Sequence, residues 1–182
     1  MVATPAPAPM GVEEFLLWAE RQPGRYELID GAVVSMAPER ASHAGLKGEV
    51  YARLRESIRA ERLACDAFVD GLGVRVGEST VYIPDVLVRC GPPLAGNETI
   101  APDPVIIVEV LSPSTQSVDL GAKLAGYFRL DTVRHFVLVD PEQRLVIHHE
   151  RTEAGQIVTH IVRDGTLRFD PPGIGLTNLF ED

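Results

Sequence analysis

The feature that most constrains this chain is an apolar run at residues 105–111 that contains a single carboxylate, Glu109. A run with so little polar content predicts a strand covered on both faces, near the centre of a sheet. Burying an unpaired carboxylate there is costly, so Glu109 requires either a cationic side chain or a metal ion beside it. An ion pair with Lys or Arg and a functional metal site are therefore the two alternatives.

A second carboxylate, Asp85, follows Pro84 inside another apolar stretch, residues 82–88. Proline within a strand indicates an edge, a bulge or a bend, where Asp85 could point at a ligand; an ordinary turn aspartate is the alternative. Two carboxylates at neighbouring strand ends, with a backbone carbonyl such as that of Val110, offer the hard oxygen ligands that Mg²⁺ prefers. We therefore favour a metal site for Glu109.

Apolar periodicity predicts a mixed α/β domain with a central sheet. Residues 105–111, 118–130 and 135–139 have the lengths of a strand–helix–strand crossover, which predicts at least one parallel strand pair. Before this unit we expect a helix at 11–21, a hairpin at 26–36 that turns at Asp30-Gly31, and a long helix at 41–63. A loop is expected at 91–104, and further strands at residues 67–69, 73–76, 81–88, 144–149, 156–163 and 166–169.

The chain length of 182 residues suits one domain, which we place at residues 11–182. Residues 1–10 are rich in Pro and Ala and lack the charged start and apolar block of a signal peptide, so we expect a disordered leader and a cytoplasmic protein. No apolar run approaches the roughly 20 residues of a membrane span. Two cysteines, Cys65 and Cys90, are too few for a disulfide framework and match no zinc site, so we expect buried thiols.

The net charge of −9 argues against a protein that coats nucleic acid, because phosphate binding requires clustered Lys and Arg. Local binding remains compatible with this charge, since a carboxylate-rich metal site itself adds negative charge. A basic strip could come from the expected long helix, where Arg55, Arg59 and Arg62 follow a three-to-four spacing and Arg53 lies nearby. A solvated helix face is the alternative for these arginines.

The order Pro84-Asp85, then Glu109 on an apolar strand, resembles the Pro-Asp…(Asp/Glu)-x-Lys signature of restriction-endonuclease-like nucleases. A larger set of residues, spread over about residues 12–180, resembles the Uma-two family of proposed nucleases with that fold. This set comprises Tyr26-Glu-Leu-Ile-Asp-Gly31, His43, Pro84-Asp-Val-Leu-Val88, Val108-Glu-Val-Leu-Ser-Pro-Ser-Thr115, Asp119 with Lys123 and Tyr127, and Leu138-Val-Asp-Pro141.

The resemblance implies a fold and an activity. The fold is a restriction-endonuclease-like core, α/β of the α+β type, in which helices flank a central mixed sheet, with a helix and hairpin before it and a β-meander after it. The activity is Mg²⁺-dependent hydrolysis of phosphodiester bonds in DNA, with Mn²⁺ as a substitute ion and RNA as an open alternative substrate. A homodimer is expected, because one acidic chain offers little basic surface.

The chain departs from the parent signature two residues after Glu109, where Leu111 stands in place of lysine. The resemblance implies that the lysine has moved to the following helix, where Lys123 matches. Asp119, Lys123 and Tyr127 recur every four residues and so share one helix face. An exposed ion pair between Asp119 and Lys123 is the structural alternative.

Two further residues complete the expected site. Glu27, between Tyr26 and Leu28, could help to hold the metal, and a solvent-facing strand glutamate is its alternative. His43, near the start of the long helix, could contact a phosphate or a water beside the metal, or have no catalytic role. Asp85, Glu109 and Lys123 are thus the expected catalytic residues, and Asp119 and Tyr127 are expected to support them or the substrate.

Two other functions remain as alternatives to a nuclease. One is a non-catalytic module that keeps the fold and binds a protein or nucleic acid. The other is a hydrolase of a different phosphoester, which is disfavoured because the sequence contains no glycine-rich phosphate loop.

Overall fold

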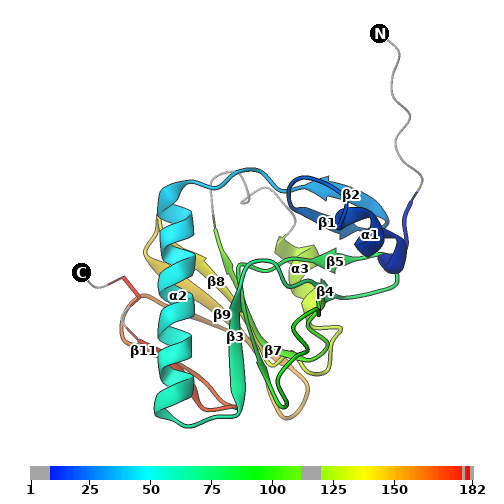
Figure 1. The fold of residues 1–182 in the computed structure, drawn as a ribbon. Coiled ribbons are helices and arrows are strands. Elements are labelled where there is room, and N and C mark those ends of the chain that lie inside the picture. Colours follow the sequence, from blue (N-terminus) through cyan, green and yellow to red (C-terminus); the bar gives the residue numbers. More distant parts are fainter. Residues whose placement is uncertain (1–8, 112–119, 178, 181–182) are drawn as a thin grey trace.

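The computed structural model describes residues 9–111, 120–177, 179 and 180, which form a mixed fold of helices and strands (Figure 1). This confirms the expected α/β class of the α+β type. The described elements are α1 (Val12–Ala19), β1 (Tyr26–Ile29), β2 (Ala32–Ser35), α2 (Ala41–Ala60), β3 (Cys65–Val69), β4 (Val74–Arg75), β5 (Val81–Tyr82), β6 (Val86–Cys90), β7 (Pro104–Val110), α3 (Leu120–Tyr127), β8 (His135–Asp140), β9 (Leu145–Arg151), β10 (Ile157–Val162), β11 (Thr166–Phe169) and β12 (Ile174–Thr177).

The central sheet has the strand order β10-β9-β8-β7-β6-β3, with β7 in its interior. Strands β7 and β8 are parallel and the other neighbours are antiparallel, which confirms the parallel pair expected from the strand–helix–strand unit. Strands β9 and β10 form the expected meander and extend this same sheet, whereas β11 and β12 pair with each other in a separate two-stranded sheet. Helix α3 ends at Tyr127, three residues before the expected end at residue 130.

A second, smaller sheet, which the sequence analysis did not predict, has the strand order β2-β1-β5-β4. The stretch at residues 81–88 is two strands, because the chain leaves the small sheet after Tyr82 and enters the central sheet at Val86. Pro84 lies in this crossing, and a proline has no N–H to continue a strand ladder. The expected hairpin is confirmed: β1 and β2 pair in antiparallel register, and Asp30 and Gly31 have φ values of 48° and 83°.

Helix α2 lies along one face of the central sheet (Figure 1). Its residues Val50, Leu54 and Ile58 are buried, and their three-to-four spacing explains why this segment forms an amphipathic helix. A second core on the opposite face contains Tyr127 of α3. Strand β12 was not predicted, because four residues that include Gly175 give too short a pattern; it pairs with β11 and contacts α2.

Cys65 and Cys90 form a disulfide, so the expectation of two buried thiols is wrong. The β3–β6 register places these residues directly opposite each other. Their separation of 25 residues in the sequence gave no indication of this pairing. No helix in the described part of the chain is long and apolar enough to cross a membrane. Most of the expected leader lies outside the described residues, and the domain at residues 11–182 stays a prediction.

Candidate functional site

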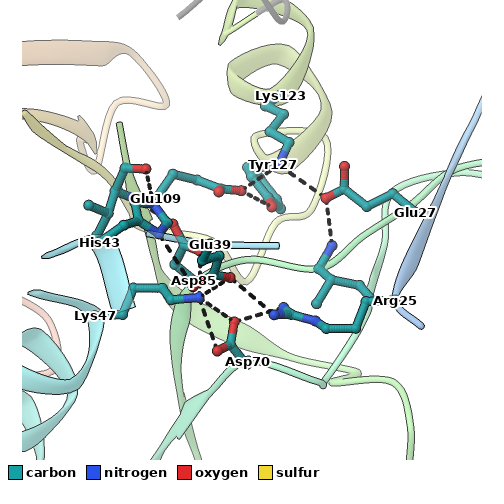
Figure 2. A network of polar contacts seen from close by, with 12 residues as sticks. Arg25, Glu27, Glu39, His43, Lys47, Asp70, Asp85, Glu109, Lys123 and Tyr127 are labelled. Atoms are coloured by element: carbon teal, nitrogen blue, oxygen red, sulfur yellow. Dashed lines mark hydrogen bonds and ion pairs between the residues drawn. The ribbon is translucent and has the colours of Figure 1, made fainter. Parts of the chain in front are cut away.

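The two predicted carboxylates meet where the small sheet joins the central sheet (Figure 2). Asp85 directly precedes β6, and the β6–β7 register pairs Val86 with Val108, so one further step brings Asp85 opposite Glu109. The backbone N–H of Val110 donates a hydrogen bond of 2.7 Å to Asp85 Oδ2. Asp85 and Glu109 are both buried, so the crossing that contains Pro84 turns Asp85 inward.

Glu109 is held by two side chains of α3. Its Oε1 accepts hydrogen bonds from Lys123 Nζ at 2.9 Å and from the Tyr127 hydroxyl at 2.8 Å. The ion pair that was the alternative for Glu109 is therefore present, and it is made by the lysine expected in the site. Lys123 and Tyr127 share a helix face as predicted, whereas Asp119 lies outside the described residues.

Glu27 is buried, so the alternative of a solvent-facing glutamate is wrong. Its Oε1 accepts hydrogen bonds from the backbone N–H of Ile83 at 2.9 Å and from Lys123 Nζ at 3.1 Å. Because β1 pairs with β5, Glu27 lies close to the chain crossing that leads to Asp85. Lys123 thus bridges Glu27 of the small sheet and Glu109 of the central sheet.

His43 lies on the first turn of α2 and faces the carboxylates. The Val110 carbonyl oxygen can only accept, so His43 Nε2 carries the proton of their 2.8 Å hydrogen bond. The same nitrogen lies 3.6 Å from Asp85 Oδ2. Leu111, which replaces the signature lysine, is buried in the apolar core and takes no polar part in the site.

Lys47 is a site residue that the sequence analysis missed. It follows His43 by one helical turn and is only 1% exposed. Its Nζ lies 3.4 Å from Asp85 Oδ1 and donates hydrogen bonds of 2.9 and 3.0 Å to the two carboxylate oxygens of Asp70. One signal was available in the sequence: Lys47 and Lys123 are the only lysines of the chain.

An outer group of charged side chains surrounds Lys47 and was also missed (Figure 2). Glu39 pairs with Lys47, and its other oxygen lies 3.4 Å from His43 Nδ1. Arg25 pairs with Asp70 at 2.7 Å and with Glu39 at 3.1 Å. These residues come from three separate segments, so no local sequence pattern connects them.

Burial raises the pKa of both central carboxylates. The pKa of Asp85 is raised by burial, although the Val110 N–H, Lys47 and His43 act in the opposite direction. Burial likewise raises the pKa of Glu109 to about 7, against the opposing effect of Lys123. Two neighbouring lysines therefore do not fully compensate the negative charge here, and a further cation would be favourable.

The donor set fits a hard divalent cation. Asp85 and Glu109 supply carboxylate oxygens, which Mg²⁺ and Mn²⁺ prefer, and Glu109 Oε2 accepts no hydrogen bond from any residue in the described ranges. A second set of potential ligand atoms, from Glu39, His43 and Asp85, lies within 4.8 Å of one another. Asp85 belongs to both sets and so is the central candidate ligand.

Comparison with known proteins gives a consistent assignment. The structure is similar to that of a "putative nuclease" from Anabaena variabilis, with a TM-score of 0.68, 19% identity and coverage of 88% of each chain, which supports the fold. Two uncharacterised proteins of Synechocystis sp. are also similar to this chain. One is 26% identical over 93% of this chain and 90% of its own length, and the other is 27% identical over 76% of this chain and 78% of its own length. Residues 12–177 match the model of the Uma2 family, described as "Putative restriction endonuclease", and the chain belongs to this family.

Proposed function

We propose that this protein is a Mg²⁺-dependent endonuclease that hydrolyses phosphodiester bonds of DNA. One observation carries the proposal: both lysines of the chain are turned toward a buried pair of carboxylates whose pKa values remain raised. The family description supports a nuclease, and its restriction-endonuclease wording supports DNA as the substrate. RNA is the alternative substrate within the same chemistry.

Asp85 and Glu109 would hold the metal, with the Val110 carbonyl and Glu27 as additional ligands; Mn²⁺ would substitute for Mg²⁺. When bound, the ion polarises the phosphate and makes a bound water more acidic. His43 occupies one side of the Val110 carbonyl through a 2.8 Å hydrogen bond, which fixes the direction of this oxygen. Glu27 already uses Oε1 to hold Lys123, so its Oε2 is the atom available for a metal.

Lys123 acts as an ammonium group in this proposal. Although burial alone would lower its pKa, Glu109 and Glu27 raise it above the ordinary lysine range. A protonated lysine does not remove a proton from water, so Lys123 orients the attacking water or stabilises negative charge on the phosphate. Tyr127 fixes Glu109 through its hydroxyl, and Lys47 fixes Asp85. Asp119 remains an expected supporting residue.

The test is cleavage of supercoiled plasmid and of single-stranded DNA and RNA in Mg²⁺, in Mn²⁺ and in EDTA. Wild type should cut DNA only with a metal, while Asp85→Asn and Lys123→Ala should each lose at least about 100-fold of the rate, comparable to the loss of one electrostatic catalytic group. Glu142→Gln, which removes an exposed carboxylate in the β8–β9 turn, is the matched control and should retain the wild-type rate. Equal rates in all four proteins would reject the proposal.

Calorimetric titration separates the nuclease from the non-catalytic module. The nuclease should bind Mn²⁺ at a site that Asp85→Asn weakens and Glu142→Gln does not. A folded wild-type protein that binds neither Mg²⁺ nor Mn²⁺ would favour the module. The homodimer and the cytoplasmic location also stay predictions, and light scattering of the purified protein tests the first.

A further inference from the structure

A groove runs along the outer edge of the central sheet. Strand β3 is the edge strand, and the groove lies between α2 and the segment at residues 93–98, with β3 at its base. Its volume is about 840 Å³. Figure 1 shows α2 and β3 side by side along this edge.

Three arginines of α2 and its C-terminal turn line the groove: Arg55, Arg59 and Arg62. All three are exposed, and none forms an ion pair with an acidic residue within the described ranges. Arg55 lies over the ring of Tyr51, with its guanidinium carbon 5.8 Å from the ring centroid. Arg53, on another face of α2, is instead paired with Glu49 and does not line the groove.

The groove also contains two acidic residues, Asp66 and Glu98. Asp66 lies opposite Arg89 in the β3–β6 register. The pKa of Arg89 is raised mainly by the hydrogen bond that it donates to Asp103, against the effect of burial, and the charge of Asp66 adds to this rise. Part of its charge is therefore compensated from within the sheet. The arginines give this face a positive excess in a chain whose net charge is −9.

The groove shares helix α2 and the end of strand β3 with the candidate site. Lys47 lies on the same helix, and Asp70, which holds Lys47, directly follows β3 at the base of the groove. At about 1.5 Å per helical residue, Arg55 and Arg59 lie about 12 and about 18 Å from Lys47 along the axis. A B-form strand advances about 3.4 Å per phosphate, so these distances correspond to about four and about five phosphates.

We propose that this groove binds the phosphate backbone of the nucleic-acid strand, several nucleotides away from the bond that the site cleaves. The guanidinium groups of Arg55, Arg59 and Arg62 bind phosphate oxygens, for which the planar arginine fork is well suited. This inference rests on the proposed function. It explains how a strongly acidic protein could hold a polyanion, because three exposed arginines line one groove that shares α2 with the site.

Binding without cleavage tests the groove separately from the chemistry. Fluorescence anisotropy in EDTA, with labelled single-stranded and duplex DNA of about 20 nucleotides and salt from about 50 to about 200 mM, gives the slope of log affinity against log salt. The double variant Arg55→Gln/Arg59→Gln should bind more weakly and lower this slope by about 1.4 on single strands or about 1.8 on duplexes. The double variant Arg163→Gln/Arg168→Gln removes the same charge from exposed positions outside the groove and is the matched control.

The outcomes distinguish this inference from the proposed function. An unchanged slope in the groove variant, an equal decrease in the control, or no binding by wild type would each overturn the groove assignment. Displacement of DNA by polyglutamate at equal charge concentration would also overturn it, because the groove would then take any polyanion, acidic proteins included. The proposed nuclease activity is tested separately: it would be rejected if wild type and Asp85→Asn cleaved plasmid DNA at equal rates.

Discussion

Lys47 and Lys123, the only two lysines of the chain, approach the two buried carboxylates from different helices (Figure 2). Lys47 comes from α2 and lies beside Asp85, whereas Lys123 comes from α3 and donates to Glu109. Since the chain has no other lysine, a measurement that detects lysine side chains reports on the candidate site alone.

Protein labelled with ¹⁵N at the lysine Nζ atoms should therefore give two side-chain NMR signals, one for each lysine. Burial alone would lower the pKa of Lys123, but Glu109 and Glu27 raise it, so its signal should titrate above the ordinary lysine range. Glu109→Gln should bring this pKa down, because it removes the nearest negative charge. A Lys123 signal that titrates identically in wild type and Glu109→Gln would contradict the pairing.

The protonation of Glu109 predicts a stability that decreases with rising pH. Burial raises its pKa to about 7 from an ordinary value of 4.5, so the folded protein binds more protons than the unfolded chain between these values. This contribution is complete below about pH 4.5 and is lost as pH rises through about 7, by up to about 1.4 kcal/mol per pH unit. Urea unfolding of wild type and Glu109→Gln between about pH 4.5 and about pH 7 gives the free energy of unfolding against pH for each protein. The free energy of wild type should fall more steeply than that of Glu109→Gln, and parallel curves would refute the prediction.

A buried histidine pair predicts the opposite pH dependence. The carbonyl of Pro171 accepts from His135 Nε2 at 2.7 Å, so in the neutral ring His135 Nδ1 accepts from His148 Nε2 at 2.9 Å. Burial, together with the smaller effect of the neighbouring histidines, lowers the pKa of His148 from 6.5 to about 3. The unfolded chain therefore binds more protons at acidic pH, and stability falls as pH decreases from about 6.5 toward about 3.

Urea unfolding between about pH 6.5 and about pH 3 measures this effect as a decrease in the free energy of unfolding. His148→Phe removes the titrating group and should flatten the decrease relative to wild type. His160→Gln, at the exposed neighbouring position, should keep most of the wild-type slope, because its effect on the pKa of His148 is smaller than that of burial. An equal slope in wild type and His148→Phe would show that other groups account for the acid sensitivity.

Gly126 has no side chain, and this lets α3 pack closely against the small sheet. A Cβ at this position would lie 2.9 Å from Cε2 of the buried Tyr82 ring and 3.4 Å from Val76. Gly126→Ala should therefore destabilise the protein by about 1 to 3 kcal/mol and slow DNA cleavage, because α3 carries Lys123 and Tyr127. Gly48→Ala is the matched control: its Cβ meets nothing within 4 Å, and the helix propensity of alanine should stabilise α2 by about 0.5 to 1 kcal/mol. Equal unfolding midpoints for the two variants would contradict this packing argument.

The central part of the fold could be predicted because its signals are local. The apolar run at residues 105–111 identified β7, and the spacing of Lys123 and Tyr127 placed both side chains on the helix face that contacts Glu109. Asp30-Gly31 identified the hairpin for the same reason, since a two-residue turn requires particular backbone angles at adjacent positions.

The remaining features depend on residues that are distant in the sequence. The separation into two sheets follows from the pairing of β5 with β1 rather than with β6, and a continuous apolar stretch does not encode that choice. Lys47 reaches Asp70 and Asp85 because α2 packs on one face of the central sheet, which brings together residues that are distant in the sequence. His148 and its partner His135 lie on neighbouring strands, so no local pattern in the sequence connects them.

The crossing at Pro84-Asp85 has a mechanical consequence. Glu27 belongs to the small sheet and Glu109 to the central sheet. Lys123 donates a hydrogen bond to each, so one ammonium group links the two sheets. Loss of either hydrogen bond therefore removes a direct polar link between the two sheets as well as a charged group of the site. The residue expected to assist the chemistry is thus also a structural link between the two sheets.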